Sequence, residues 1–208
     1  TITLELPLYR TWDPALLPQV SWWSSDGVHP GNPEYTGLED ITIDGSNVAL
    51  AQGGLVGAEM VSYFWMKNVE VGYVPSRAVW LYIAYRPEIR DSYVHDAIRT
   101  GSTNYGIQTD WVSGGLFENN ICKSMINCMM VAYSNAGNVF GYNYATLNSP
   151  GSYTQQGDIA QHDAHNWMNL YEGNQIDMVY NDYVHGSGSR NTLFRNRITG
   201  YAGLEKTQ

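Results

Sequence analysis

The sequence predicts an all-β fold, a right-handed single-stranded parallel β-helix in which about seven coils stack into a solenoid. Two observations predict it. A six-residue pattern returns along the chain at a spacing of 23 residues or somewhat more. The 208-residue chain is also rich in glycine (21) and aromatic residues (13%) and poor in charged residues (15%), a composition typical of many short strands joined by tight turns.

Each copy of the pattern reads as a short strand, a turn residue and a second short strand. The copies span residues 38–43, 66–71, 89–94, 117–122, 140–145, 171–176 and 194–199. Their third residues, the turn positions 40, 68, 91, 119, 142, 173 and 196, differ by 28, 23, 28, 23, 31 and 23. A solenoid with a minimal coil of 23 residues, and with extra residues confined to its loops, gives these differences. A globular sandwich would not keep this spacing.

Equivalent residues of stacked copies should lie one strand spacing apart, roughly 4.8 Å, and share one environment. The residues two before each turn position form one column, and because side chains alternate along a strand, the residues one and three after it should point inward. The first column is apolar and ends in an aromatic stack: Phe117, Phe140, Tyr171 and Phe194. The second column contains Asn120, Asn143 and Asn174, followed by Arg197. Stacked buried amides can bond to one another, so we expect an internal asparagine ladder.

The repeat divides the chain into an irregular N-terminal segment or flank, residues 1–35, and the parallel β-helix, residues 36–208. Proline and glycine turns mark the first segment as a loop, in which Trp22 and Trp23 should cover an open coil end or a flank. The chain starts directly in strand-like alternation and stops after a coil without a capping helix. We therefore expect part of a longer parent chain, or coils that assemble end to end.

The net charge of -9 disfavours nucleic acid as a partner, because an acidic surface repels phosphate backbones. A polyanionic substrate would need a local basic patch or a bound cation. No apolar run approaches the ~18 residues of a membrane span, so we expect no membrane insertion. Cys122 and Cys128 are too few for a disulfide scaffold, and we expect two small core residues, with a local disulfide as the alternative.

The runs at residues 65–71, 86–93, 137–144 and 168–174 resemble the pectin-lyase-like superfamily, and more narrowly its bacterial right-handed parallel β-helix repeat proteins. Coils of that superfamily carry asparagine ladders and aromatic stacks. The resemblance covers about residues 36–200 and implies the fold. It implies no single activity, because members include polysaccharide lyases, glycoside hydrolases, phage tailspikes and adhesins.

A further strand precedes each copy of the pattern, and one of its faces should form an outward patch. Aromatic rings bind the apolar faces of sugars and polar groups bind their hydroxyls, so this patch is a candidate saccharide surface. Its expected substrate-binding residues are Trp80, Tyr82, Gln108 and Tyr133. The same face should carry Asp110, His162 and His185, which we take as candidate catalytic residues. The alternative is an ordinary sheet face packed under a loop.

His162-Asp163-Ala164-His165 is the densest ionisable run, and it follows a long polar loop, residues 148–158, of the kind that often forms a cleft. His162 and His185 should share one column in adjacent coils, where they could divide acid and base roles or bind a metal together. The His-x-x-His spacing scatters side chains to both strand faces, so we assign no metal ligands. Asp110 and Asp163 form an unconvincing hydrolytic pair, because they lie two coils apart.

His95 and Lys123 form a second candidate catalytic pair, four places after the turn position in neighbouring coils. In β-elimination from a uronate polymer, Lys123 could neutralise the substrate carboxylate and His95 could remove the adjacent proton. Ca²⁺ would be a possible cofactor of such a lyase. The alternative for this pair is a solvated turn.

We therefore expect an extracellular or cell-surface β-helix that binds or cleaves a polysaccharide, as a polysaccharide lyase or a glycoside hydrolase that acts on an acidic plant or microbial polymer. The competing hypothesis is a non-catalytic structural solenoid, such as an adhesin or a filament module. Such a module would form an end-to-end or lateral homo-oligomer through its open ends.

Overall fold

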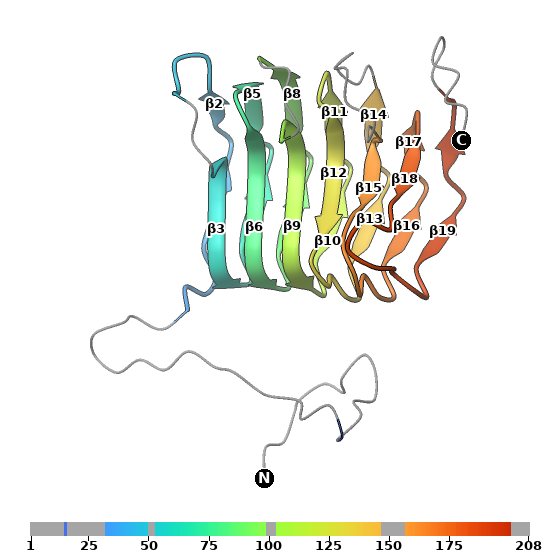
Figure 1. Cartoon of the computed structure of the whole chain (residues 1–208). Coiled ribbons are helices and arrows are strands. Elements are labelled where there is room, and N and C mark those ends of the chain that lie inside the picture. Colours follow the sequence, from blue (N-terminus) through green and yellow to red (C-terminus); the bar gives the residue numbers. More distant parts are fainter. Residues whose placement is uncertain (1–14, 16–31, 50–52, 99–102, 147–156, 201–208) are drawn as a thin grey trace.

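The chain forms a right-handed parallel β-helix, which confirms the predicted fold (Figure 1). A computed structural model describes residues 15, 32–49, 53–98, 103–146 and 157–200. Two sheets of seven strands and one of six run along the solenoid, and each strand pairs in parallel with its equivalent in the next coil. The expected irregular segment, residues 1–35, with Trp22 and Trp23, lies almost entirely outside the described residues.

Three strands follow one another in each coil, one for each sheet. The first sheet contains β1 (Gly37–Glu39), β4 (Trp65–Lys67), β7 (Glu88–Arg90), β10 (Leu116–Glu118), β13 (Val139–Gly141), β16 (Leu170–Glu172) and β19 (Thr192–Phe194). The second contains β2 (Thr42–Asp44), β5 (Glu70–Val74), β8 (Tyr93–Ala97), β11 (Ile121–Lys123), β14 (Tyr144–Thr146), β17 (Gln175–Ile176) and β20 (Arg197–Ile198). The third contains β3 (Gly54–Ser62), β6 (Arg77–Tyr85), β9 (Tyr105–Ser113), β12 (Asn127–Ala132), β15 (Ile159–Gln161) and β18 (Val179–Asn181).

The turn between the first and second sheets uses one backbone conformation in every coil. Its single residue has a positive φ, between 52° and 66°, and turns the chain from a strand of the first sheet into a strand of the second. These turn residues are Asp40, Asn68, Asp91, Asn119, Tyr142, Gly173 and Arg195. The first six are the predicted turn positions.

The last coil departs from the predicted register by one residue. Tyr171 pairs with Leu193 instead of Phe194, and Gln175 pairs with Arg197. The turn residue is Arg195, with φ 55°, so the last coil has 22 residues between turn positions instead of 23. Phe194 consequently points outward and is 51% exposed, and the prediction that it extends the aromatic stack is wrong.

The aromatic stack itself is confirmed for three consecutive coils. The rings of Phe117 and Phe140 lie 4.6 Å apart and those of Phe140 and Tyr171 5.0 Å apart, all nearly parallel and fully buried. They continue the column of Leu38, Met66 and Ile89, so one apolar ridge runs down the interior.

The predicted asparagine ladder is also confirmed, and it extends one coil further. The side chain of Asn143 donates to Asn174 Oδ1 (3.0 Å) and to the Phe117 carbonyl (2.9 Å), and Asn120 donates to Asn143 in the same way. In the last coil, Asn196, not Arg197, is the next member of the ladder after Asn174. Two further amide columns, not predicted from the sequence, form hydrogen bonds with backbone groups at the turn between the third and first sheets. They are Asn135 with Asn166, and Asn138 with Asn169 and Asn191.

Cys122 and Cys128 form a disulfide bond, so the preferred interpretation of two free core residues is wrong. The bond joins β11 to the start of β12 and lies inside the fourth coil, where both residues are buried. It closes the corner between the second and third sheets.

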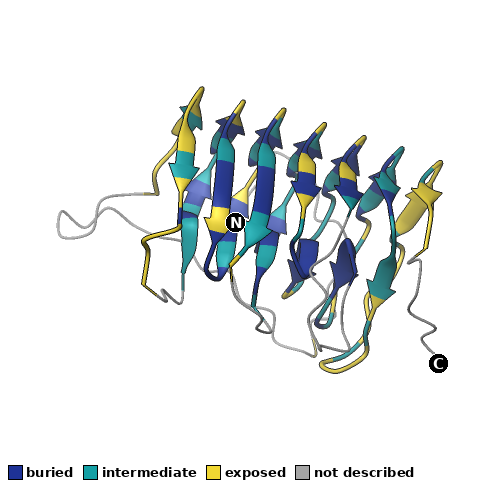
Figure 2. Cartoon of the chain, turned by 90° about the horizontal axis from the view of Figure 1, so that it is seen from above, coloured by how far each residue is buried: buried dark blue, intermediate teal, exposed yellow. Residues whose placement is uncertain are grey.

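Burial is greatest in the middle coils and smallest in the last one (Figure 2). Leu193, Phe194 and Ile198 of the last coil are 44%, 51% and 53% exposed. Within the described residues, no helix is long and apolar enough to cross a membrane.

Candidate functional site

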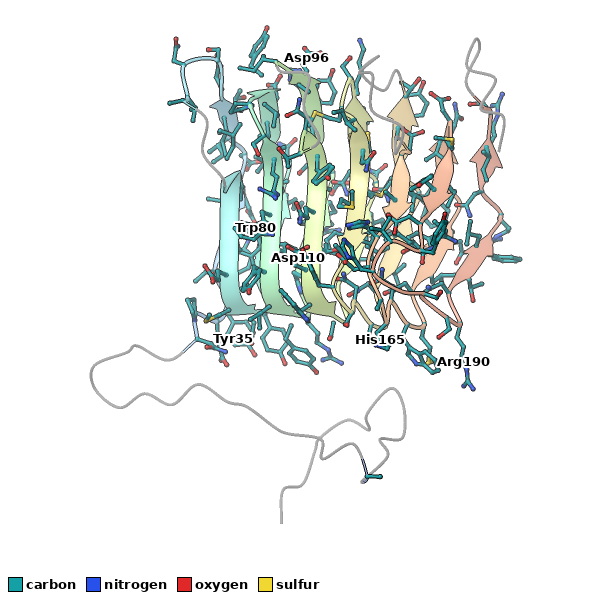
Figure 3. The ribbon with its side chains drawn as sticks, viewed as in Figure 1. Tyr35, Trp80, Asp96, Asp110, His165 and Arg190 are labelled. Atoms are coloured by element: carbon teal, nitrogen blue, oxygen red, sulfur yellow. A yellow bond between two sulfur atoms is a disulfide. The ribbon has the colours of Figure 1, made fainter. Side chains whose placement is uncertain are left out.

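The outward face of the third sheet carries the predicted patch, and the pairing of strands fixes its register. Trp80 of β6 pairs with Gln108 of β9, and Tyr82 pairs with Asp110. Trp80 and Asp110 lie on these two neighbouring long strands in Figure 3. The four side chains therefore form a block across two coils, as the alternation predicted.

The next strand, β12, is displaced by one residue from the predicted alignment. Ala132, not Tyr133, pairs with Asp110, and this places Val131 in the core. The cause is an additional residue in the following turn, where Tyr133 and Ser134 both have positive φ. Tyr133 therefore leaves the strand at its end and is 41% exposed.

Asp110 is buried, and neighbouring side chains donate hydrogen bonds to its carboxylate. Its Oδ2 accepts a hydrogen bond from Trp80 Nε1 (2.7 Å), and Gln108 Nε2 donates to both carboxylate oxygens (2.9 and 3.0 Å). Arg77 donates to Gln108 Oε1 and lies over the Trp80 ring, 5.3 Å from its centre. Burial raises the pKa of Asp110 above its usual range, although these hydrogen bonds and Arg77 lower it in part. Asp110 thus orients Trp80 and Gln108 from beneath the surface.

Four aromatic residues form a continuous strip on this face, which we call the aromatic strip: Trp80, Tyr82, Trp111 and Tyr133. Ring centres are 5.4 Å apart for Trp80 and Tyr82 and 5.2 Å for Tyr82 and Trp111, both edge to face. Trp111 and Tyr133 stack at 4.7 Å and are the exposed end of the strip, at 42% and 41%. This end offers ring surface to a ligand.

Trp111 was not among the residues predicted from the sequence. Strict alternation along β9 would turn Trp111 inward, opposite to Asp110. Its φ of 53° interrupts the alternation, so that Trp111 is exposed between buried Asp110 and Val112. Ile83 is the equivalent residue one coil earlier. The spacing of residues in the sequence does not reveal that either position has a positive φ.

Beside the strip lies a second group, which we call the histidine cluster: His162, Asp163, Asp182 and His185. His162 aligns with Ala132 and Asp110, because Ala160, two residues earlier, pairs with Met130. Gln161 pairs with Asn181, so the register places Asp182, not His185, beside His162, and the predicted column of His162 and His185 is not a strand pairing. The two rings nevertheless meet edge to face, 4.9 Å apart, because the segment after β18 lies against the segment after β15, where Gly186 also contacts Ala164.

Hydrogen bonds orient the cluster. Asp182, adjacent to His162 across the β15–β18 pairing, accepts a hydrogen bond at Oδ2 from His162 Nδ1, and its Oδ1 accepts from the Val184 backbone (3.2 Å). Because a carboxylate only accepts, the proton of neutral His162 is on Nδ1, and Nε2 has a free lone pair. Asp163 lies 3.7 Å from Nε2 of both His162 and His185.

The cluster borders two hollows. A pocket of about 250 Å³ is lined by His162, Asp182 and His185 together with Tyr105, Met130 and Tyr180. A second pocket of about 350 Å³ is lined by Gln161, Asp163, Asp182 and Asn191, among others. Asp163 itself is buried, with a side chain 6% exposed.

Electrostatics connect the strip with the cluster. Partial burial raises the pKa of the Tyr133 hydroxyl, and the charges of Asp163 and Asp110 raise it further. Asp163 also raises the pKa of Asp110. Tyr133 and both carboxyl groups therefore belong to one surface region, although their strands are two coils apart.

His95 and Lys123 are neighbours in register on β8 and β11, as predicted. The His95 ring leans over Gly72 of the preceding coil, where a Cβ atom would come within 2.7 Å of Cε1 and only glycine leaves room. Its Nε2 contacts Glu70 (3.1 Å) and its Nδ1 contacts Asp96 (2.9 Å), while Lys123 is exposed. Two carboxylates beside the expected base oppose the approach of an acidic sugar.

Among the described residues, the His/Cys/Asp/Glu group that could hold a metal ion is His162, Asp163 and His185, whose ligand atoms lie within 4.8 Å of one another. Comparison with protein families, with curated proteins and with solved structures gives no match to this chain. The β-helix fold is therefore shown by the strand pairing, and the resemblance to the pectin-lyase-like superfamily stays an expectation from sequence.

Proposed function

We propose that this protein is an extracellular β-helix that binds a polysaccharide on the outward face of its third sheet. The exposed Trp111–Tyr133 end of the aromatic strip, next to the histidine cluster, is the observation that carries this proposal. A sugar ring packs its apolar face on exposed aromatic surface, and nearby carboxylates and imidazoles bind its hydroxyl groups. The strip and the cluster supply both kinds of group side by side.

The extracellular location is supported by the Cys122–Cys128 disulfide, because disulfides persist in oxidising compartments. The resemblance to secreted polysaccharide-active β-helices agrees with it. The net charge of -9 favours a neutral polymer, or an acidic one that binds through a cation.

Hydrolysis fits this surface better than β-elimination. Elimination from a uronate needs a cation beside the substrate carboxylate, whereas Asp110, Asp163 and Asp182 make the region acidic. Hydrolysis needs acid and base groups, and Asp163 with the imidazoles of His162 and His185 supplies them. Cleavage by this route produces new reducing ends without an unsaturated sugar.

The test is a binding and cleavage screen on polygalacturonate, alginate and glucans, with and without Ca²⁺. Trp111→Ala and Tyr133→Ala should each weaken binding of the best ligand about 10-fold, as loss of 1–2 kcal/mol of ring contact implies. Tyr144→Ala, on the second sheet and equally exposed at 40%, is the matched control and should bind normally. No binding to any polymer, or equal losses in all three variants, would contradict the proposal.

A second candidate function is end-to-end assembly, and the exposed apolar residues of the last coil favour it. Leu193, Phe194 and Ile198 lie on strands whose outer edges have no partner among the described residues. The occupant would be the first coil of a second copy, a head-to-tail contact that builds filaments. Sedimentation of the wild type and of Phe194→Asp tests it, and a monomer at every concentration excludes it.

A further inference from the structure

We propose that His162, Asp163 and His185 form a binding site for a divalent first-row transition-metal ion, of which Zn²⁺ is the natural probe. The three residues converge from two coils: His162 and Asp163 directly follow β15, and His185 comes from the segment after β18. Binding of the ion does not depend on polysaccharide binding by the aromatic strip, but in the ion-bound protein these three side chains are ligands and do not act as free acid and base groups.

The distances fit a metal better than hydrogen bonds. Asp163 Oδ2 lies 3.7 Å from His162 Nε2, and Asp163 Oδ1 lies 3.7 Å from His185 Nε2, both beyond hydrogen-bond range. Ligand atoms 2.0–2.1 Å from a tetrahedral Zn²⁺ are about 3.3 Å from one another. The three ligand atoms, one from each residue, lie within 4.8 Å of one another, so a shift of up to about 1.5 Å would bring them to coordination distance. The His185 side chain is 54% exposed and has room to make it.

Asp163 is an unusual carboxyl group in this setting. Its side chain is only 6% exposed, and its Oδ2 is buried without a hydrogen-bond partner in the part of the chain that the structure describes. A buried carboxylate whose two oxygens each face an imidazole without a hydrogen bond to it is costly unless something lies between them. A cation bound by all three groups removes that cost.

Asp182 adds an independent indication. Histidine ligands of metals usually donate their other ring N–H to a carboxylate, which fixes the tautomer and orients the ring. Asp182 accepts that hydrogen bond from His162 Nδ1 and is itself fixed by the Val184 backbone. His162 thus presents its Nε2 lone pair toward Asp163, as a ligand requires.

The donor set indicates the class of ion. Two imidazole nitrogens and one carboxylate suit Zn²⁺ and its first-row neighbours, whereas Ca²⁺ prefers six to eight oxygen ligands. Three protein ligands leave a fourth position for water, and the 250 Å³ pocket beside His162 and His185 gives access to it.

The test is titration of the full chain, first stripped with a chelator, with Zn²⁺ alone by calorimetry and by competition with a chromogenic chelator. We expect one ion per chain, and Co²⁺ in its place should give the visible absorption of a four-coordinate ion. His185→Ala should lower the Zn²⁺ affinity at least 10-fold, and Asp182→Asn, which acts only through His162, about 10- to 100-fold.

His165→Ala is the matched control. His165 belongs to the same segment, is exposed, and lies at the lower edge of the solenoid in Figure 3, outside the group that could hold an ion. Its variant should bind Zn²⁺ as the wild type does. Equal affinity of His185→Ala and His165→Ala would mean adventitious binding and would overturn the proposal, as would the lack of a stoichiometric site. Circular dichroism verifies that each variant is folded.

Discussion

Tyr171 buries a hydroxyl group that has no hydrogen-bond partner in the described part of the chain. Burial accordingly raises its pKa far above the usual range. Since an unpaired buried hydroxyl costs free energy while the ring stacks on Phe140, Tyr171→Phe should stabilise the protein by about 1 kcal/mol in urea unfolding. The reverse variant, Phe140→Tyr, should destabilise it. A less stable Tyr171→Phe would mean that the hydroxyl is paired.

Asp110 should make stability depend on pH. Its folded-state pKa is raised, chiefly by burial, so the folded protein holds this proton more tightly than the unfolded chain does. The resulting stabilisation is complete below the unfolded pKa of about 3.9 and is lost as pH rises through the folded pKa. The wild type should therefore lose stability relative to Asp110→Asn as pH rises from about 4 to 7.

Urea unfolding of both proteins across this range measures the difference. Glu59→Gln, an exposed position on strand β3 of the same sheet, two coils from Asp110, is the control and should follow the wild type. A constant difference between wild type and Asp110→Asn would contradict the assignment.

At the scale of elements, the register of the last coil can be tested by two adjacent alanine variants. Asn196 accepts two hydrogen bonds from Asn174 and donates one to the Tyr171 carbonyl. Asn196→Ala leaves those groups unpaired and should cost about 2–3 kcal/mol, whereas exposed Arg197→Ala should change stability by less than about 0.5 kcal/mol. The 23-residue spacing predicted from sequence would place Arg197 in the ladder and reverse this order.

The disulfide ties β11 to β12 across a corner of the fourth coil. Closing a loop of about seven residues stabilises a fold by about 2 kcal/mol, because it restricts the unfolded chain. The double variant Cys122→Ala/Cys128→Ala should lose about that much under oxidising conditions. Under reducing conditions, the wild type should approach the variant. Two reactive thiols per oxidised, unfolded chain would show that the bond does not form.

For the whole molecule, the sequence predicts more of the fold than of the site. Coil number, aromatic stack and ladder follow from the repeat because stacked equivalents share one environment, as Phe117 and Asn143 illustrate. Spacing between copies cannot reveal where within a coil a residue is lost or added. The register therefore failed at Phe194 and Tyr133, where one-residue changes lie in turns.

The site depends on features that no local pattern contains. Trp111 is exposed through one positive φ, and Asp182 reaches His162 only because β18 pairs with β15. His185 comes near His162 as expected, but from the segment after β18 and not through the strand column that the spacing suggested. The long loop at residues 148–158, expected to form a cleft, lies mostly outside the described residues.

The recurring left-handed turn between the first and second sheets has a consequence for how such a chain can change in length. Each turn from Asp40 to Arg195 has the same backbone shape, so the chain enters and leaves every coil in the same direction. The segment from one such turn to the next is a module that can be duplicated or deleted, because the neighbouring modules would still contact each other through equivalent surfaces. Gene duplication can thus lengthen the molecule coil by coil, and an engineer can do the same while leaving the aromatic strip and the histidine cluster in place.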